Sequence, residues 1–343
     1  WLDNSELESH PALGDETLAA RHQAAMSRIA AVKSEWLAQT DEIRRQTDGQ
    51  ISRYTGKNYE PRWPLVAARH TSSSRENIYP SVIDAAQVRE WNEGERVKNG
   101  LVLESARVTN QKWELTYALK REDIDDDASG VVAQALSRIR SGTMKFKRHM
   151  DKLVFNVVKN NGTCLDGLAL FHATHPVNPR DNAAGTFSNT TTGALTADTF
   201  DAGRVAMMEL KGPDGDPINE NPNVLIVAPA REKVARKILE ADEVIYSGTA
   251  TDNREFNVFK GRGTVVVIPH LSTAHGGNDA YWYLADTTDT EDRGLIAQVR
   301  EEVEFVSLTN LNDPNVFNFD EYVWGMRARH TAAGGNPKKI FRR

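Results

Sequence analysis

An acidic run occupies residues 123–127 and reads Asp-Ile-Asp-Asp-Asp. Its carboxylates fall on alternate positions, the spacing that a calcium-binding EF-hand loop uses for its first ligands. The rest of that motif is missing, because Ala128 stands where the loop needs glycine and Gln134 where it needs glutamate. Carboxylates at a helix start accept hydrogen bonds from free N–H groups and interact favourably with the helix dipole. We therefore interpret Asp123–Asp127 as the cap of the helix that follows.

Two histidines, His172 and His175, are the second candidate for metal chemistry. Zinc hydrolases often carry paired histidines on one helix together with a glutamate that acts as base. Here the pair lies three residues apart just before Pro176, without that glutamate, which favours structural or surface histidines. A metal-dependent hydrolase or nuclease that combines Asp123–Asp127 with His172 and His175 is the alternative function. The leading interpretation includes no catalytic residue, metal or cofactor.

The single cysteine, Cys164, excludes an intramolecular disulfide and a cysteine-rich metal site. We expect only distant histidines around this thiol and nothing marks it as activated, so we expect a buried, inert cysteine. One cysteine in 343 residues fits a reducing compartment such as a cytoplasm.

The charge balance excludes a protein whose whole surface wraps nucleic acid, because 42 Lys and Arg face 48 Asp and Glu, for a net charge of -6. One region is locally basic. It comprises Arg138, Arg140, Lys145, Lys147 and Arg148, with Lys152 nearby. Such a helix face can lie near phosphates without reading sequence, and a solvated helix flank is the simpler alternative. No window has the ~18 uninterrupted apolar residues of a membrane span.

The spacing of apolar residues predicts the elements around these groups. Three- and four-residue spacing predicts helices, and alternation or short apolar runs predict strands. The expected helices cover residues 15–45, 129–159, about 196–210 and 231–241. A long hairpin is expected at 78–119, with its turn at 93–100. Buried strands are expected at 224–227 and 265–268, and antiparallel strands at 281–284, 296–308 and 321–329. The hydrophobic fraction of 39% is low for a compact chain of this length. An arm and a hairpin that bury their surface between copies would explain it.

This order of elements, together with specific sequence segments, resembles a known family. The segments are His175-Pro176 with residues 178–186, residues 195–200 and 207–211, residues 222–227, residues 281–284 and 298–301, and Val316-Phe317 with residues 320–329. They resemble the Hong Kong 97-type major capsid protein of tailed bacteriophages, and more specifically the Mu-like major head protein. The resemblance spans roughly residues 79–330.

The resemblance implies an α+β fold with a long spine helix, an extended β-hairpin loop, and peripheral and axial domains. The implied parts are an N-terminal arm with a helix at 1–77, the hairpin loop at 78–122, a peripheral domain with its spine helix at 123–220, an axial domain at 221–290, and returning peripheral strands with a C-terminal tail at 291–343. It also implies a non-enzymatic protein that self-assembles, as hexamers and pentamers, into an icosahedral virion shell around double-stranded DNA. The implied partners are further copies of the chain, a portal, a scaffold or protease, and decoration proteins, with no membrane.

Four apolar residues are the expected anchors between subunits, because aromatic side chains dominate contact energies. They are Trp36 on the arm and Trp91, Trp113 and Leu115 on the hairpin.

Overall fold

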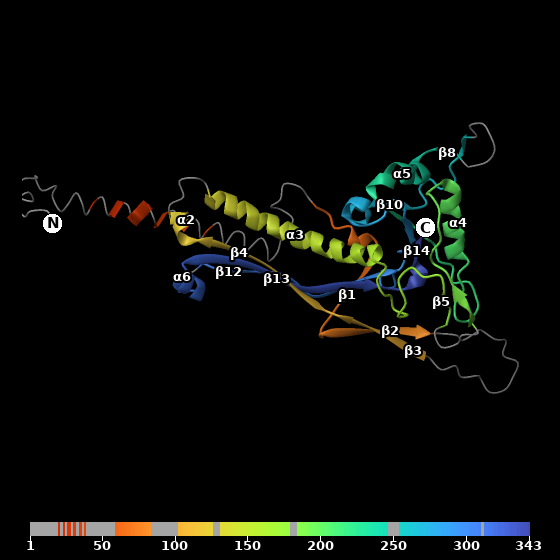
Figure 1. Ribbon diagram of the computed structural model, residues 1–343, viewed down its shortest axis with the longest axis horizontal. Helices are drawn as coiled ribbons and strands as arrows, with labels where there is room; N and C mark the ends of the chain where they lie inside the picture. The colour runs from red at the N-terminus through yellow and green to blue at the C-terminus, as the bar shows by residue number, and fades with distance from the viewer. Residues whose placement is uncertain are drawn as a thin grey trace, which may run out of the picture. The chain divides into compact units, whose positions relative to one another are not determined.

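The computed structural model describes residues 59–83, 102–125, 131–178, 184–245, 254–309 and 312–343, and single positions between 20 and 38 (Figure 1). The chain divides into two compact units. Unit 1 comprises Trp1–Asn58, Glu114–Met144 and Glu304–Met326, and unit 2 comprises Tyr59–Trp113, Lys145–Val303 and Arg327–Arg343.

Unit 2 is built around a four-stranded sheet with the strand order β10 (Thr264–Val267), β7 (Val224–Val227), β11 (Trp282–Ala285), β14 (Ile340–Arg342). Strand β7 runs parallel to β10 and antiparallel to β11. Its sequence, Val-Leu-Ile-Val, is buried along its whole length. A continuous apolar run of this kind is expected where both faces of a sheet are covered. The buried strand predicted at 224–227 is therefore confirmed; the strand predicted at 265–268 is present as β10, but in it only Val266 is buried.

The two faces of this sheet belong to two different hydrophobic clusters. Val224 and Ile226 pack into one cluster, while Leu225 and Val227 pack into the other. The first cluster includes residues of the long helix α3 (Val131–Lys159) and of strands β1 (Ala67–Thr71) and β12 (Leu295–Leu308). The second includes helices α4 (Ala197–Met208) and α5 (Glu232–Glu240). The sheet thus lies between two cores.

Helix α4 begins as its sequence predicts. Thr196 is the N-cap, and it exchanges side-chain to backbone hydrogen bonds with Thr199 in a capping box. Gly203 lies close to β11, since a Cβ atom there would meet Leu284 Cδ1 at 3.0 Å. The small residue therefore allows the helix to pack tightly on the sheet.

A second sheet has the order β1, β12, β13 (Glu321–Gly334), β4 (Gln111–Lys120), and its β1–β12 pair is parallel.

Strands β2 (Glu76–Ile83) and β3 (Val102–Thr109) form an antiparallel pair in register from Glu76 opposite Thr109 to Ile83 opposite Val102. This confirms the base of the predicted hairpin, whose turn lies outside the described residues. The predicted second strand is interrupted at Asn110, so that β4 joins the other sheet. The smaller elements are α2 (Arg121–Asp125), β5 (His175–Pro176), β6 (Thr186–Phe187), β8 (Glu243–Ile245), β9 (Arg254–Phe256) and α6 (Pro314–Phe319).

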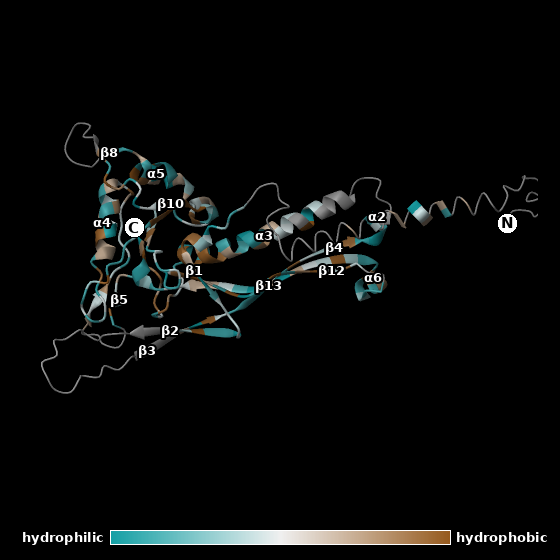
Figure 2. Cartoon of the chain, turned by 180° about the vertical axis from the view of Figure 1, so that it is seen from behind, coloured by the Kyte–Doolittle hydropathy of each residue, from teal (hydrophilic) through white to brown (hydrophobic). Residues whose placement is uncertain are grey.

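The long helix predicted at 129–159 is confirmed as α3. Figure 2 colours its described part both teal and brown, as expected of an amphipathic helix. Met150, Val154, Phe155 and Val158 pack into the first core of unit 2. After Lys159 the helix ends in a turn in which Asn161, rather than the glycine after it, adopts the left-handed conformation, with a φ of 50°. Asparagine tolerates this conformation better than most residues.

The predicted cap of the long helix does not include Asp123 or Asp125, and Asp126 and Asp127 lie outside the described residues. Asp123 and Asp125 lie within a separate short helix, α2, and the first turn of α3 carries no acidic residue. Arg121 N donates to Asp320 O, so α2 directly continues the paired strand β4. The carboxylates of Glu122 and Asp123 therefore favour the first turn of α2 itself.

The C-terminal residues, predicted to be a basic tail, form strand β14 instead. It pairs antiparallel with β11, and Phe341 lies opposite Leu284. The Lys339 ammonium lies 2.6 Å from the carboxylate of Glu220, which is buried. An apolar Ile340-Phe341 pair explains why the segment is buried despite its basic neighbours.

Each described residue between 20 and 38 is helical, in agreement with the predicted arm helix. No helix among the described residues is long and apolar enough to cross a membrane.

A buried carboxylate, Asp151 of α3, holds the segment that precedes β1. Its Oδ1 accepts hydrogen bonds from the backbone N–H groups of Trp63 (2.7 Å) and Arg62 (3.0 Å), and Tyr59 donates its hydroxyl to Oδ2. Burial and this carboxylate raise the pKa of Tyr59 above its ordinary value, so the phenol stays a donor. One side chain thus satisfies donors from several neighbouring residues.

We expect Asp151→Ala to lower the free energy of unfolding by about 2–4 kcal/mol, because buried donors lose their acceptor. Chemical denaturation of the purified chain measures the change, with the exposed Asp216→Ala as control. A loss of less than about 0.5 kcal/mol, typical of surface positions, would contradict the anchoring role.

Candidate functional site

Trp113, one of the predicted interface anchors, has partners inside unit 2. Its indole N–H donates to His330 O at 2.9 Å, and its ring packs edge-on against His149 with centroids 4.3 Å apart. Leu115 lies two residues further along β4 and is partly exposed. Trp36 and Trp91 lie outside the described residues. The interface roles of these four residues stay predictions.

Trp113 contacts a histidine pair. His149 Nδ1 lies 2.9 Å from His330 Nε2, so one ring donates and the other accepts. Burial lowers the pKa of His330 to about 4, and His149 adds to the lowering. Burial, and then Lys152, also lower the pKa of His149. The pair is therefore neutral at pH 7.

Helix α6 of unit 1 exposes aromatic side chains that the sequence analysis did not select. Phe317 is 84% exposed and Phe319 is 69% exposed, whereas Val316 of the same helix is buried. Both side chains are therefore accessible to a partner. The sequence signal for these residues is the segment Asn-Val-Phe-Asn-Phe directly after Asp313-Pro314. Interpreting Asp313-Pro314 as a turn between strands draws attention away from it.

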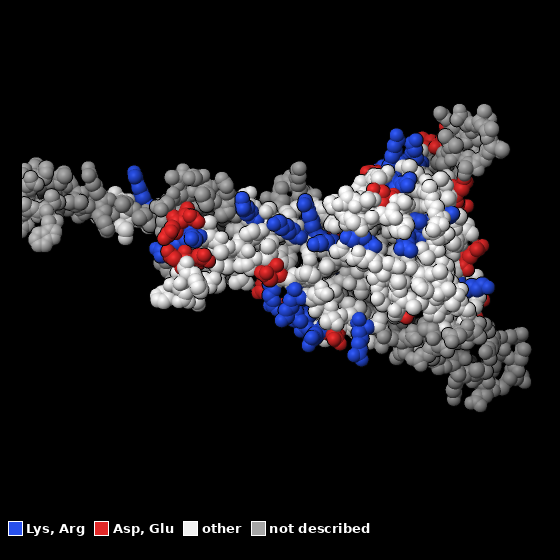
Figure 3. All heavy atoms as spheres, viewed as in Figure 1, with Lys and Arg blue, Asp and Glu red and all other residues white. Residues whose placement is uncertain are grey.

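The basic residues predicted near 138–152 form a stripe on α3. Arg138, Lys145, Arg148 and Lys152 are exposed, and their spacing of seven, three and four places them on one helix face. Figure 3 shows Lys and Arg side chains along this helix. Lys147 is half-buried, and Arg140 lies in α3 without a described side chain. The Arg148 guanidinium lies over the Tyr59 ring, 4.9 Å from its centroid.

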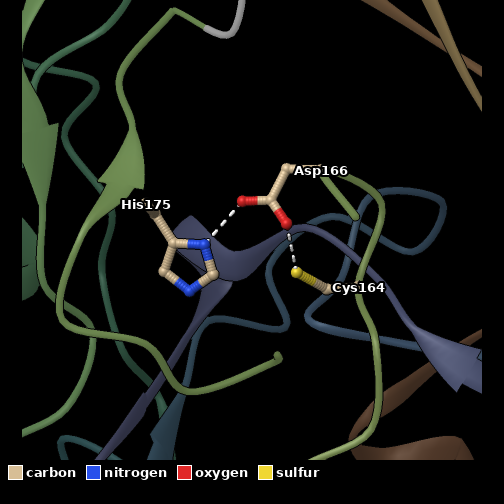
Figure 4. Close-up of side chains that lie close together, drawn as sticks. All are labelled: Cys164, Asp166 and His175. Atoms are coloured by element: carbon tan, nitrogen blue, oxygen red, sulfur yellow. Dashed lines mark hydrogen bonds and ion pairs between the residues drawn. The ribbon is translucent and has the colours of Figure 1, made fainter. Parts of the chain in front are cut away.

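Cys164 lies in a cluster with Asp166 and His175, shown in Figure 4. Its Sγ donates to Asp166 Oδ1 at 2.7 Å, and Asp166 Oδ2 lies 2.5 Å from His175 Nδ1. The expectation that the histidines are distant from Cys164 is therefore wrong for His175, which shares the Asp166 carboxylate with the cysteine. The expectation of a buried, unreactive thiol is supported, because burial and the Asp166 carboxylate raise the pKa of Cys164.

The alternative hydrolase site is not assembled among the described residues. The described residues contain one group of three potential metal ligands, and it includes His175 but neither Asp123 nor His172. Residues 126 and 127 lie outside the described part.

The α+β fold is similar to that of solved phage capsid subunits. One such structure is the mature capsid of bacteriophage PhiM1, with a TM-score of 0.53 and 10% sequence identity. The match covers 84% of this chain and 88% of the PhiM1 chain. The capsid of bacteriophage JBD30 decorated with minor capsid protein trimers is also similar, with a TM-score of 0.50, 19% identity, and coverage of 64% and 94%.

Within this class, the chain belongs to the family of the Mu-like prophage major head subunit gpT, whose family model matches residues 50–197, 191–271 and 270–341. The major capsid protein of Escherichia phage Mu is 29% identical over 128 residues. That match covers 36% of this chain and 40% of the Mu protein. The predicted family and fold are therefore confirmed.

The histidine pair predicts a loss of stability in acid. The pKa of His330 in the folded protein lies below the ordinary value of ~6.5, so its contribution is present above pH 6.5 and is lost as the pH falls towards 4. Between pH 7.5 and pH 5 this one group accounts for about 2 kcal/mol. Denaturation of His330→Gln at both pH values is expected to show a correspondingly smaller loss. The exposed His275→Gln serves as control, and an unchanged pH dependence in His330→Gln would contradict the assignment.

Proposed function

We propose that this chain is a major head subunit whose copies assemble, as hexamers and pentamers, into an icosahedral virion shell that encloses double-stranded DNA. The observation that carries the proposal is the match to the major head subunit family, which extends from residue 50 to residue 341. The capsid fold and the exposed aromatic side chains of α6 support it. In this proposal the protein is structural and not an enzyme.

The proposed partners are other copies of the chain, a portal, a scaffold or protease, and decoration proteins. The JBD30 capsid of similar fold carries minor capsid protein trimers, which supports a decoration partner for this chain. The predicted arm, hairpin loop, peripheral and axial domains are part of the same proposal.

Electron microscopy and sedimentation test the shell directly. The purified chain, co-expressed with the head-assembly proteins of its own phage, is expected to form closed particles or related polymers. Persistent monomers under these conditions would overturn the proposal.

The exposed phenylalanines of α6 generate a prediction about assembly. Phe317→Ser with Phe319→Ser is expected to reduce the yield of particles at least tenfold, because burial of each aromatic side chain contributes about 1.5–3 kcal/mol, repeated at every interface. The thermal stability of the unassembled chain should hardly change, since both side chains are exposed there. Asn318→Ser on the same helix is the control and should assemble normally. Normal particle yield from the double variant would remove α6 from the interface.

The basic stripe generates a prediction about DNA. In the proposed shell it faces the lumen and contacts phosphates without reading sequence. Lys145→Ala with Lys152→Ala should weaken binding of double-stranded DNA and lower the slope of log K against log salt by about 2. Lys233→Ala with Lys237→Ala, two exposed lysines of α5, is the matched control. An equal loss in both pairs would show that the stripe has no special role.

A further inference from the structure

The Cys164 cluster contains three different potential metal ligands from separate segments of unit 2. Cys164 and Asp166 come from the loop after α3, and His175 comes from β5. One atom from each, the sulfur, a carboxylate oxygen and a ring nitrogen, lies within 4.8 Å of the other two. All three side chains are largely buried: Cys164 is 4% exposed, His175 is fully enclosed, and the Asp166 side chain is 10% exposed.

Hydrogen bonds within the cluster do not satisfy the imidazole. Nδ1 of His175 faces Asp166, but its Nε2 is buried and has no hydrogen-bond partner in the structure. Nδ1, which faces Asp166, is therefore the nitrogen that an ion within the cluster would meet, and Nε2 stays outside the ligand set. The stacking of His175 on Phe187, with centroids 5.2 Å apart, holds the ring in place without satisfying this nitrogen.

We propose that Cys164, Asp166 and His175 bind one divalent transition-metal ion, and that zinc is the ion that this set of donors fits best. Sulfur, nitrogen and carboxylate oxygen are the protein ligands of zinc, which is commonly held by three side chains and a water molecule. Zinc bond lengths of about 2.0–2.3 Å place neighbouring ligand atoms roughly 3.5 Å apart. The two short hydrogen bonds to Asp166 would each open by about 1 Å to admit it.

The charges of the site match a dication. The Asp166 carboxylate accepts hydrogen bonds from the Cys164 thiol and the Leu168 N–H and lies 2.5 Å from His175 Nδ1, so it acts as an acceptor on both oxygens. When the ion binds, the Cys164 thiol loses its proton to solvent, and the thiolate forms the metal–sulfur bond. If Nδ1 is the ligand, its proton moves to Nε2 and the ring stays neutral. One thiolate and one carboxylate then neutralise the ion, so no net charge is buried.

The backbone holds the ligands and leaves a route to them. Gly167, with a φ of 82°, closes the turn by donating its N–H to Cys164 O at 3.1 Å. Asp166 Oδ1 also accepts the Leu168 N–H at 3.0 Å, which fixes the carboxylate. Cys164 and Asp166 line a cavity of about 830 Å³ within unit 2, which provides access for the ion and room for a water ligand. Bound metal would join the loop after α3 to the β5–β6 pair.

The test uses the purified, unassembled full chain, so its outcome does not depend on shell formation. The chain is stripped with a chelator, loaded with zinc chloride and dialysed, and its metal content is measured by mass spectrometry. We expect one zinc per chain and a rise in Tm of a few degrees. Cobalt(II) in place of zinc should give a thiolate-to-cobalt charge-transfer band and the intense visible bands of a four-coordinate ion.

Near-isosteric variants assign the ligands. Cys164→Ser, Asp166→Asn and His175→Gln should each lose the stoichiometric zinc and the rise in Tm, and Cys164→Ser should also lose the charge-transfer band. His172→Gln is the matched control, because its ring lies 5.8 Å from that of His175 but outside the ligand set. No zinc on the wild-type chain, or equal zinc on wild type and Cys164→Ser, would overturn the proposal. The wild-type cobalt spectrum decides the question even if a variant fails to fold.

Discussion

Strand β7 imposes the constraint on which unit 2 depends, because all four of its side chains are buried and they point alternately into two cores. Neither face of such a strand tolerates water, so each must be covered by another element. One face is covered by α3 together with β1 and β12, and the other by α4 and α5. A shift of register by one residue would exchange the two sets of side chains between the cores. The placement of both layers follows from this one strand.

The same sheet also fixes the C-terminal segment of the chain. Strand β14, at the C-terminus, pairs with β11 and contributes Ile340 to one core and Phe341 to the other. Next to this pair, Lys339 lies between two buried carboxylates, Glu220 and Asp286. Burial raises the pKa of Glu220 to about 7, although the lysine opposes the rise, while hydrogen bonds keep the pKa of Asp286 low. A single ammonium thus serves both carboxylates, and the last segment is fixed by charge as well as by apolar contact.

Elements with strong local periodicity could be predicted from the sequence. The apolar spacing of α3, the all-apolar β7 and the Thr196 cap each carry a local signal for the type of element that forms. Other features depend on partners far along the chain. Asp123 and Asp125 lie in a helix of their own, α2, at whose start Arg121 N donates to Asp320 O, and the C-terminal residues form a strand paired with β11. Spacing in sequence carries no information about either partner.

The candidate sites show the same division. The basic stripe follows from helical periodicity alone, so its residues could be named in advance. The Cys164 cluster could not, because the turn at Gly167 and the β5–β6 pair bring His175 back to the cysteine. Trp113 was selected as an aromatic residue on a hairpin, yet its indole N–H is already bonded to His330 O. Composition identifies an aromatic side chain but does not show whether its own subunit satisfies it.

The distribution of buried surface connects the fold to assembly. Both hydrophobic clusters consist of residues of unit 2, and among the described residues unit 1 has no cluster of that kind. Its buried side chains, such as Ile139, Phe305 and Trp324, come from α3, β12 and β13, while α6 exposes Phe317 and Phe319. A small unit buries a smaller share of its surface than a large one and gains less stability from it. In the proposed shell, neighbouring copies supply the missing contacts for unit 1, so its folding and the assembly of the head draw on the same apolar surface.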